Sequence, residues 1–366
     1  MRVACEREIL TKNIGAVQRA ISGRSTLPVL NNILMEAKDE QLRLLATDIE
    51  LAIEAKFPAK VEKEGSITFP GKYFLEIVRR LPSGEVEMEL EKGTIIHIKS
   101  GKTHFSISGL SSDEFPILSQ IKDGAGVNIK PENLKALIED TTFATSKDEV
   151  TRPELSGILL VLYPDKVQAV GTDGNRLALR EIEEETGITS KQEVLLPSRA
   201  LEEYLRISGD EEELKIIIGQ NQVDFIMPAK KLSTRKIQSK FPSWEQVIPQ
   251  SYEATFLVDT KKFQEALDRC YLLARLIANK VHLKGEGGAF LLSTTVPEVG
   301  SVEEEVEWAQ GTANIELHFN VRYLLEGLRG IKTEYTFIGF TGKERPLVLR
   351  PSDEKGYLYL AMPLRA

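Results

Sequence analysis

Two aspartates are the residues of this chain whose type and setting are best suited to chemistry. Asp48 lies in the segment LLATDIELAI and Asp173 in AVGTDGNRLAL, each directly after a threonine. Paired carboxylates can hold two divalent cations for phosphoryl transfer. A metal-dependent phosphoryl-transfer enzyme is therefore one reading, and a turn in which each aspartate side chain caps the backbone is the other.

The remaining chain supports no other catalytic centre. It has no Gly-x-x-x-x-Gly-Lys-Ser/Thr loop for nucleotide phosphates, and no Ser-His-Asp or Cys-His grouping is evident. None of the four histidines has a cysteine or aspartate at metal-ligand spacing. They are His97, His104, His282 and His318. We therefore expect no metal and no cofactor.

The cysteine content and the ends of the chain predict a cytoplasmic protein. Cys5 and Cys270 are too few for a disulfide framework, which favours buried thiols in a reducing compartment. The first residues, MRVACEREIL, lack the apolar region of a signal peptide. No apolar run approaches the roughly 18 residues of a membrane span, so we expect no membrane partner.

The two aspartates belong to an internal repeat. Thr47-Asp48 matches Thr172-Asp173, and Phe115-Pro116 matches Phe241-Pro242 at nearly the same offset. ITFPGKYFLEIVRRLPSGEVEMEL resembles VLLPSRALEEYLRISGDEEELKIII and, more weakly, ELHFNVRYLLEGLRGIKTEYTFIGF. Periods of this kind mark repeated structural units. The third copy has LLSTTVPEV in place of the Thr-Asp segment, so a shared turn explains the aspartates better than a metal site does.

Each unit of about 120 residues predicts an α+β domain. Helices are expected at 8–22, 71–81, 131–146, 197–208, 260–277 and 319–332, from apolar residues at helical spacing. In the first unit, strands are expected at 2–7, 29–36, 41–46, 48–57, 65–69, 85–91, 94–100 and 103–109, from alternating apolar residues. The Gly-rich stretch 122–126 and the surroundings of Pro249 are the predicted linkers. The domains are therefore expected at 1–120, 121–248 and 249–366, each with two helices and about eight short strands in two sheets.

Charge is distributed unevenly between these elements. The whole chain carries a net charge of −8, but six segments around the predicted helices together carry +9. These segments are 11–28, 71–83, 131–147, 197–208, 260–280 and 319–332. In the first helix, Leu10, Ile14 and Val17 share an apolar stripe with Ile21, while Lys12 and Arg19 lie on the opposite face. Helices gathered on one side would make a basic surface that follows a phosphate backbone without reading bases.

The whole chain resembles the bacterial DNA polymerase III beta subunit family, the replicative sliding clamps. The segments that carry the resemblance are TLPVLNNILMEA, ATDIELAI, FSISGLSSDEFP, GTDGNRLAL and YLYLAMPLRA, in this order and spacing. The resemblance implies three DNA-clamp domains per subunit and a head-to-tail ring of two subunits that encircles duplex DNA and catalyses nothing itself. Implied partners are double-stranded DNA, the polymerase III catalytic subunit, the clamp loader, and other polymerases and repair proteins.

The resemblance also implies binding residues. By position, DNA would be met by Arg24, Lys72, Arg199 and Arg275, and the helical faces add Lys12 and Lys280. A pocket for partner peptides of the type Gln-Leu-x-Leu-Phe would be formed by Arg152, Leu155, Thr172, Gly174, Asn175, Arg176, Leu177, Pro242, Val247, Pro346, Met362, Pro363 and Leu364. Leucine, valine and methionine would supply an adaptable apolar cleft, and Arg176 would donate to the peptide. Asn175 and the chain end at Ala366 depart from the pattern familiar in this family.

Exposed leucines predict the contact between subunits. In the helix that begins at Thr260, Phe263, Leu267 and Cys270 form the core stripe with Ile277. Leu272, Leu273 and Leu276 lie off or beside that stripe. Paired with an edge strand that carries Phe105 and Ile107 on another copy, they would form a dimer interface between unlike surfaces. A structural assembly protein without a DNA partner is the alternative to a clamp.

Overall fold

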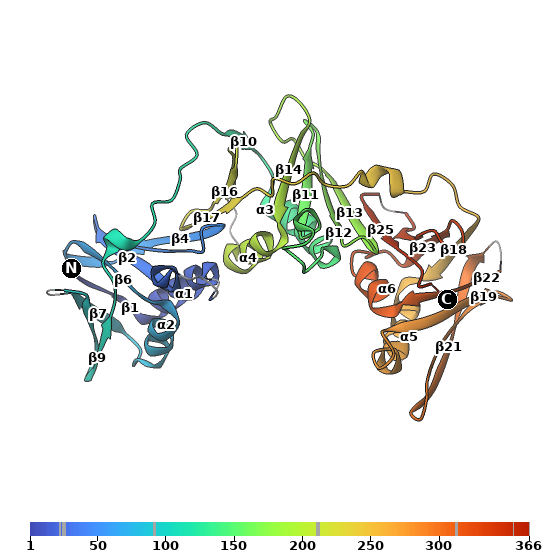
Figure 1. Cartoon of the computed structure of the whole chain (residues 1–366), viewed down its shortest axis with the longest axis horizontal. Coiled ribbons are helices and arrows are strands. Elements are labelled where there is room, and N and C mark those ends of the chain that lie inside the picture. The colour runs from blue at the N-terminus through green and yellow to red at the C-terminus, as the bar shows by residue number, and fades with distance from the viewer. Residues whose placement is uncertain are drawn as a thin grey trace. The chain divides into compact units, whose positions relative to one another are not determined.

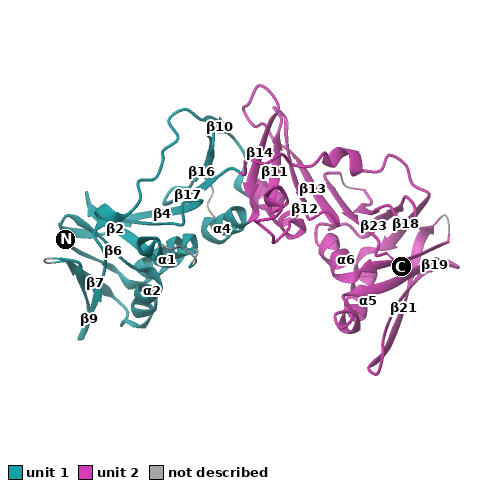
Figure 2. Cartoon of the chain, in the orientation of Figure 1, with its two compact units in different colours: residues 1–131, 199–236 teal, residues 132–198, 237–366 magenta. Residues whose placement is uncertain are grey.

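The computed structural model describes residues 1–21, 23, 27–90, 93–209, 213–311, 314–353 and 355–365. Its contacts divide the chain into two compact units (Figure 2). Unit 1 contains residues 1–131 and 199–236, and unit 2 contains residues 132–198 and 237–366. The second repeat therefore contributes elements to both units.

Six α-helices are present in the described ranges, one for each predicted helix (Figure 1). They are α1 (Arg7–Val17), α2 (Gly71–Arg80), α3 (Pro131–Glu139), α4 (Ser198–Ser208), α5 (Thr260–Ala274) and α6 (Val321–Leu328). The prediction for α3 was too long. The hydroxyl groups of Thr141 and Thr142 donate to the carbonyl oxygens of Leu137 and Ile138. The helix ends early because these side chains replace backbone N–H groups as donors to the last carbonyl groups.

Unit 1 contains two antiparallel sheets. The five-stranded sheet has the order β5 (Lys60–Lys63), β1 (Arg2–Glu6), β7 (Glu85–Leu90), β8 (Ile95–Ser100) and β9 (Thr103–Ser108). The eight-stranded sheet has the order β10 (Ala125–Val127), β15 (Lys215–Ile218), β16 (Gln222–Ile226), β17 (Lys230–Arg235), β4 (Leu51–Pro58), β3 (Gln41–Thr47), β2 (Asn32–Lys38) and β6 (Gly65–Pro70).

Unit 2 contains one twelve-stranded antiparallel sheet. Its order is β14 (Gln192–Pro197), β11 (Gly157–Leu162), β12 (Lys166–Thr172), β13 (Arg176–Glu183), β25 (Tyr357–Ala361), β24 (Leu347–Pro351), β23 (Tyr335–Phe340), β18 (Ala254–Asp259), β21 (Gly300–Gly311), β20 (Ala289–Val296), β19 (Lys280–Glu286) and β22 (Ile315–Asn320). The three repeats thus contain nine, eight and eight described strands, close to the eight expected.

Three strand predictions need correction. Residues 29–31 are not extended, because Pro28 starts a short 3₁₀ helix, Pro28–Asn31, and β2 begins only at Asn32. The strand expected from residue 48 begins at Leu51, because Asp48 holds a turn. Strand β5 was not predicted, because its residues Lys60–Lys63 are mostly charged. In addition, the expected linker 122–126 overlaps strand β10.

Sheet pairing joins successive repeats. In unit 1, β4 of the first repeat pairs with β17, the last strand of the second, with Leu51 opposite Thr234. In unit 2, β13 of the second repeat pairs with β25, the last strand of the third, with Arg176 opposite Ala361. The corresponding edges of the first and second repeats therefore each receive the last strand of the next repeat.

The predicted apolar stripes lie in the core. Leu10, Ile14 and Val17 of α1 are fully buried, and α1 packs on α2, β3 and β4. Phe263, Leu267 and Cys270 of α5 are also fully buried, and α5 packs on α6, β20 and β21. Ile277 is only half-buried, because α5 ends at Ala274.

Candidate functional site

The Thr-Asp segments form the same turn in the first two repeats. The hydroxyl of Thr172 donates to the carbonyl oxygen of Arg176 at 2.6 Å, and Oδ1 of Asp173 accepts from the backbone N–H groups of Asn175 and Arg176 at 2.8 and 3.1 Å. Thr47 and Asp48 make the corresponding contacts in the first repeat. Carboxylates that cap a turn in this way are acceptors for backbone donors.

The corresponding turns of all three repeats also share a residue with positive φ. Ile49, Gly174 and Glu298 occupy this position with φ values of 82°, 90° and 65°. Only glycine adopts this region without strain. The turn is thus a repeated structural feature that persists in the third repeat, where the aspartate is absent.

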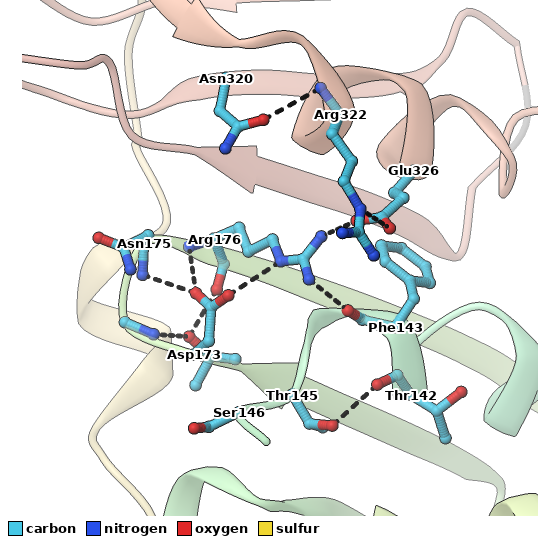
Figure 3. Close-up of polar contacts among 12 residues, drawn as sticks. Thr142, Phe143, Thr145, Ser146, Asp173, Asn175, Arg176, Asn320, Arg322 and Glu326 are labelled. Carbon is cyan, nitrogen blue, oxygen red and sulfur yellow. Dashed lines mark hydrogen bonds and ion pairs between the residues drawn. The ribbon is translucent and has the colours of Figure 1, made fainter. Parts of the chain in front are cut away.

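Arg176 links this turn to α6 within unit 2 (Figure 3). Its Nε donates to Oδ2 of Asp173 at 3.0 Å, its Nη1 forms an ion pair with Glu326, and its Nη2 donates to the carbonyl oxygen of Phe143 at 2.5 Å. The guanidinium group also lies 4.3 Å from the centre of the Tyr323 ring. All three nitrogens contact the protein itself, so Arg176 fixes the turn in this structure.

The charge of Arg176 is stabilised although its side chain is only 9% exposed. Burial opposes the charged form, but the neighbouring Tyr359 and Glu326 outweigh burial, and the pKa of Arg176 is raised. Glu326 is shared with Arg322, whose Nε donates to its second oxygen at 2.9 Å. The network therefore joins β13 of the second repeat to α6 of the third with satisfied charges.

Several predicted pocket residues gather around the same turn. The backbone N–H of Met362 donates to the carbonyl oxygen of Asn175 at 2.8 Å, which places the terminal segment beside the turn. The Arg152 side chain lies next to Gly174. Leu177 is buried in an apolar cluster that includes Trp244. The polypeptide thus brings the Arg152 segment, the turn and the terminal segment together within unit 2.

The pocket residues differ in accessibility. Leu155, Leu177 and Thr172 are buried, whereas Val247 is 52% exposed. Arg152, Gly174, Asn175 and Pro242 are exposed, and Pro346, Met362, Pro363 and Leu364 are half-buried. Leu155 and Leu177 are therefore core residues of this chain, whereas Val247, Pro242 and part of Met362 are accessible apolar residues.

A cavity of about 1220 Å³ lies on the other side of the terminal segment, within unit 2. Met362, Pro363 and Leu364 line it together with residues of β19, β22 and the segment 342–344. The backbone N–H of Leu364 donates to the carbonyl oxygen of His318 at 2.8 Å and holds the terminal segment against β22. The other predicted pocket residues do not line this cavity.

The predicted DNA-facing residues differ in how free their charges are. Lys12, Lys72 and Arg275 are exposed and make no ion pair with another described residue. Lys280 is half-buried. Arg199 is half-buried and pairs with Asp48, Nη1 to Oδ2, at 2.6 Å. Arg24 lies outside the described residues. Arg79 of α2, which our prediction did not include, is as exposed and as free of ion pairs as Lys72.

Exposed apolar side chains lie where the subunit contact was predicted. Leu272 of α5 and Leu276, which follows the end of this helix, are 60% and 57% exposed, and Leu273 is half-buried. β9 is an edge strand of its sheet, with Phe105 exposed and Ile107 half-buried. Tyr73 of α2 is 65% exposed, and our prediction of exposed apolar residues did not include it. Its position on the basic face of a predicted amphipathic helix was the available signal.

The fold brings together histidines that are distant in the sequence. His282 of β19 and His318 of β22 are paired across the strands, with ring centres 4.8 Å apart, and His282 Nε2 lies 3.0 Å from Glu316. Within the described ranges, no group of three or more His, Cys, Asp or Glu could hold a metal ion. Over the same ranges, no helix is long and apolar enough to cross a membrane.

Comparisons with known proteins cover the whole chain. Residues 1–119, 128–243 and 245–365 match the N-terminal, central and C-terminal domains of the DNA polymerase III beta subunit. The beta sliding clamps of Staphylococcus epidermidis and Staphylococcus aureus are both 31% identical over 100% of this chain and 99% of their own length.

Solved structures agree with these relatives. The DNA polymerase sliding clamp from Bacillus subtilis has 30% identity and a TM-score of 0.94, covering 100% of this chain and 99% of its own. The beta subunit from DNA polymerase of Streptococcus pyogenes has 25% identity and a TM-score of 0.92, with both chains fully covered. The chain, with its three clamp domains, therefore belongs to the bacterial DNA polymerase III beta subunit family, the DNA sliding clamps of the replicative polymerase.

Proposed function

We propose that this sliding clamp works as a closed ring of two copies that encircles duplex DNA and tethers the polymerase III catalytic subunit to it. The clamp loader, other polymerases and repair proteins would use the same ring in the cytoplasm. The proposed domains are 1–120, 121–248 and 249–366. One observation supports the ring: the first and second repeats each receive the last strand of the next repeat, and among the described strands the corresponding edges of β9 and β21 have no such partner.

The unused edges are on β9 and β21. β9, the last strand of the first repeat, pairs only with β8 among the described strands. β21 is the strand of the third repeat that corresponds to β4 in the first repeat and β13 in the second. Within the described chain, its residues Gly300–Glu307 pair only with β20. Pairing of β21 with β9 of a second copy would repeat the joint seen twice within the chain. Two such joints close a head-to-tail ring.

The internal joints also give the register of this pairing. Residues Leu51, Arg176 and Gly300 each follow the positive-φ residue of the repeated turn by two positions. Just after the last strand of each repeat, one backbone N–H bonds the strand that precedes the second helix of that repeat. These N–H groups belong to Leu110, Ile237 and Leu364, which are therefore equivalent. The residues three positions before them, Ile107, Thr234 and Ala361, are then equivalent as well. Since Leu51 faces Thr234 and Arg176 faces Ala361, Gly300 is expected to face Ile107 of the partner subunit.

This register brings the exposed apolar residues to the joint. Phe105 would face Val302 of the partner subunit. Val302 and Glu304 are on the same face of β21, and Glu304 pairs with Arg269 of α5 at 2.7 Å, so this face is turned toward α5. Phe105 would therefore meet the exposed Leu272 and Leu276. Lys72 is the counterpart of Arg199, so it would approach the turn around Glu298 just as Arg199 approaches Asp48.

DNA binding is proposed to be independent of sequence. Lys12, Arg79 and Arg275 are exposed and form no ion pair within the described chain, and such charges interact with phosphates through a salt-sensitive attraction. Lys72 is also unpaired among the described residues of the single chain, but in the ring it would approach Glu298 of the partner subunit. Among the described residues, Arg199 contributes less to this attraction because Asp48 neutralises part of its charge. Arg24 and Lys280 complete the proposed set.

The partner-binding surface is proposed at the turn of the second repeat. Val247, Met362 and the residues around Gly174 would receive the apolar side chains of a Gln-Leu-x-Leu-Phe peptide, above the buried Leu155 and Leu177. Arg176 would act by holding the turn in place rather than by donating to the peptide, because its nitrogens already have partners.

We propose that this accessory subunit has no active site of its own. Both oxygens of Asp48 and of Asp173 accept contacts from the protein, which gives each carboxylate a structural role. The purified chain should therefore neither polymerise nucleotides nor hydrolyse ATP or DNA, with or without magnesium. Nuclease activity that disappeared in a folded Asp173→Ala variant would replace the clamp with the enzyme.

The test of the ring is its topological link to DNA. The chain is loaded by a bacterial clamp loader onto nicked circular DNA and separated from free protein by gel filtration at high salt. Retention that is lost once the circle is cut supports a ring, because a closed ring leaves DNA only over an end. Equal retention on circular and linear DNA, or none on either, would contradict the proposal and favour an assembly protein without a DNA partner.

A further inference from the structure

A histidine occupies the proposed joint between the two copies. β9 places His104 on the face opposite to Phe105, and His104 is exposed. In the register given by the internal joints, His104 lies opposite Glu303 of the partner subunit, and Lys102 lies opposite its Glu305. Glu303 and Glu305 are also exposed. The joint therefore places a lysine and an imidazole opposite two carboxylates.

We propose that proton binding by His104 tightens the ring, so that the affinity between the two copies rises as the pH falls from about 8 to about 6. This inference rests on the proposed dimer. A protonated imidazole opposite a carboxylate is stabilised in the dimer and lacks that partner in the free subunit. Dimerisation should therefore take up protons, and linkage makes the dimer more stable at the lower pH.

The other charges around His104 modulate this effect without cancelling it. On its own sheet, His104 is paired with Lys99 of β8, whose Nζ lies 3.7 Å from Glu87 of β7. Ser106 shares its face of β9 and bonds His97 at 2.9 Å, and Lys102 lies in the turn directly before β9. The partner would present Ser301, Glu303 and Glu305. Lys99 and Lys102 oppose protonation of His104, whereas Glu303 and Glu305 favour it and lie across the joint only in the dimer.

The contact occurs twice in a ring of two copies. An exposed ion pair contributes little by itself. Two of them predict a decrease of roughly two- to thirtyfold in the dimer dissociation constant between pH 8 and pH 6. Exchange of fluorophore-labelled subunits, followed by energy transfer at both pH values, measures this change even when the dimer is tight.

Matched variants separate His104 from other titrating groups. His104→Gln should remove the pH dependence, and Glu303→Gln should do the same from the other side of the joint. His104→Arg should give a tight dimer at both pH values. His97→Gln is the control, because His97 lies on the same face of the sheet but on β8, one strand away from the joint. It should behave as the wild type does.

The outcomes distinguish this inference from the ring itself. A wild-type dimer with equal affinity at pH 6 and pH 8 would overturn the role of His104 and leave the ring intact. So would a His104→Gln variant that kept the wild-type pH dependence. A wild-type chain that stayed monomeric at both pH values would overturn the ring, and the inference with it.

Discussion

Asp48 and Arg199 form an ion pair that joins the first repeat to the second within unit 1. Oδ2 of Asp48 accepts from Nη1 of Arg199 at 2.6 Å, while its Oδ1 accepts from the backbone N–H of Leu51 at 2.9 Å. The Asp48 side chain is only 8% exposed, and that of Arg199 is 38% exposed. One carboxylate therefore stabilises both a turn and the contact between two repeats.

Asp48→Ala should lower the free energy of unfolding by about 1–3 kcal/mol, because the backbone N–H groups of Glu50 and Leu51 lose a charged acceptor. Arg199→Ala should cost less than about 1 kcal/mol, since an ion pair with one exposed partner contributes little. Urea unfolding followed by circular dichroism measures both. Asp123→Asn, at an exposed position, is the control. A larger loss for Arg199→Ala than for Asp48→Ala would contradict this division of roles.

The two thiols should be unreactive in the folded chain. Burial, with a smaller effect of the neighbouring Glu6, raises the pKa of Cys5 to about 12. Burial, followed by Glu304, raises the pKa of Cys270 to about 11. Since the thiolate is the reactive form, iodoacetamide at pH 8 should leave both cysteines unmodified in the folded protein and alkylate both in urea, as mass spectrometry would show. Rapid alkylation of the native chain would disprove their burial.

Sequence periodicity was sufficient to locate the helices and most strands because most elements have one buried and one exposed face. Leu10 and Ile14 of α1, and Phe263 and Leu267 of α5, lie in the core as their spacing predicted. Two of the errors fall where local hydrogen bonds override periodicity. Asp48 holds its turn against the strand pattern, and Thr141 ends α3 through its hydroxyl group.

Contacts between distant side chains were beyond the reach of sequence patterns. The spacing of Asp173 and Arg176 gives no sign that Glu326 completes their network, because that ion pair depends on how α6 packs against β13. The pairing of His282 with His318 likewise depends on the register of β19 and β22. The exposure of Leu272 was predictable, because its angular position relative to Phe263 on the same helix places it away from the buried face.

Helix charges should control DNA binding in a salt-dependent way. Lys12→Glu and Arg275→Glu should each weaken binding and lower the slope of log affinity against log salt concentration by about one unit or more, because the replaced cation no longer releases a counterion. Fluorescence anisotropy with short duplexes of two unrelated sequences measures the slope. Lys60→Glu, on strand β5, is the control and should leave it unchanged. Equal effects of all three substitutions would contradict a DNA-binding role specific to the helices.

Leu272→Asp should give folded monomers. Leu272 is 60% exposed in the single chain, so the substitution costs the fold little, but a carboxylate at an apolar joint loses its hydration without a partner. Sedimentation velocity measures the association state, and circular dichroism verifies the fold. Ile117→Asp is the matched control, because Ile117 is 99% exposed and lies outside the proposed joint. A dimeric Leu272→Asp variant would place the contact elsewhere.

Removal of the terminal segment should separate partner binding from DNA binding. Deletion of residues 362–366 takes away Met362, whose N–H bonds Asn175, and with it one wall of the proposed peptide surface. Burial of a leucine or phenylalanine side chain contributes about 1.5–3 kcal/mol, so the peptide Gln-Leu-Asp-Leu-Phe should bind roughly ten- to a hundredfold more weakly. Met362→Ala should give a smaller loss, because it keeps the backbone bonds. Both variants should still dimerise, since Phe105 and Leu272 are unchanged.

Lys12→Glu is the control for this experiment. It should bind the fluorescent peptide as the wild type does and lose only DNA contact. A truncated chain that bound the peptide with wild-type affinity would move the partner surface away from Met362, even if the ring itself were confirmed.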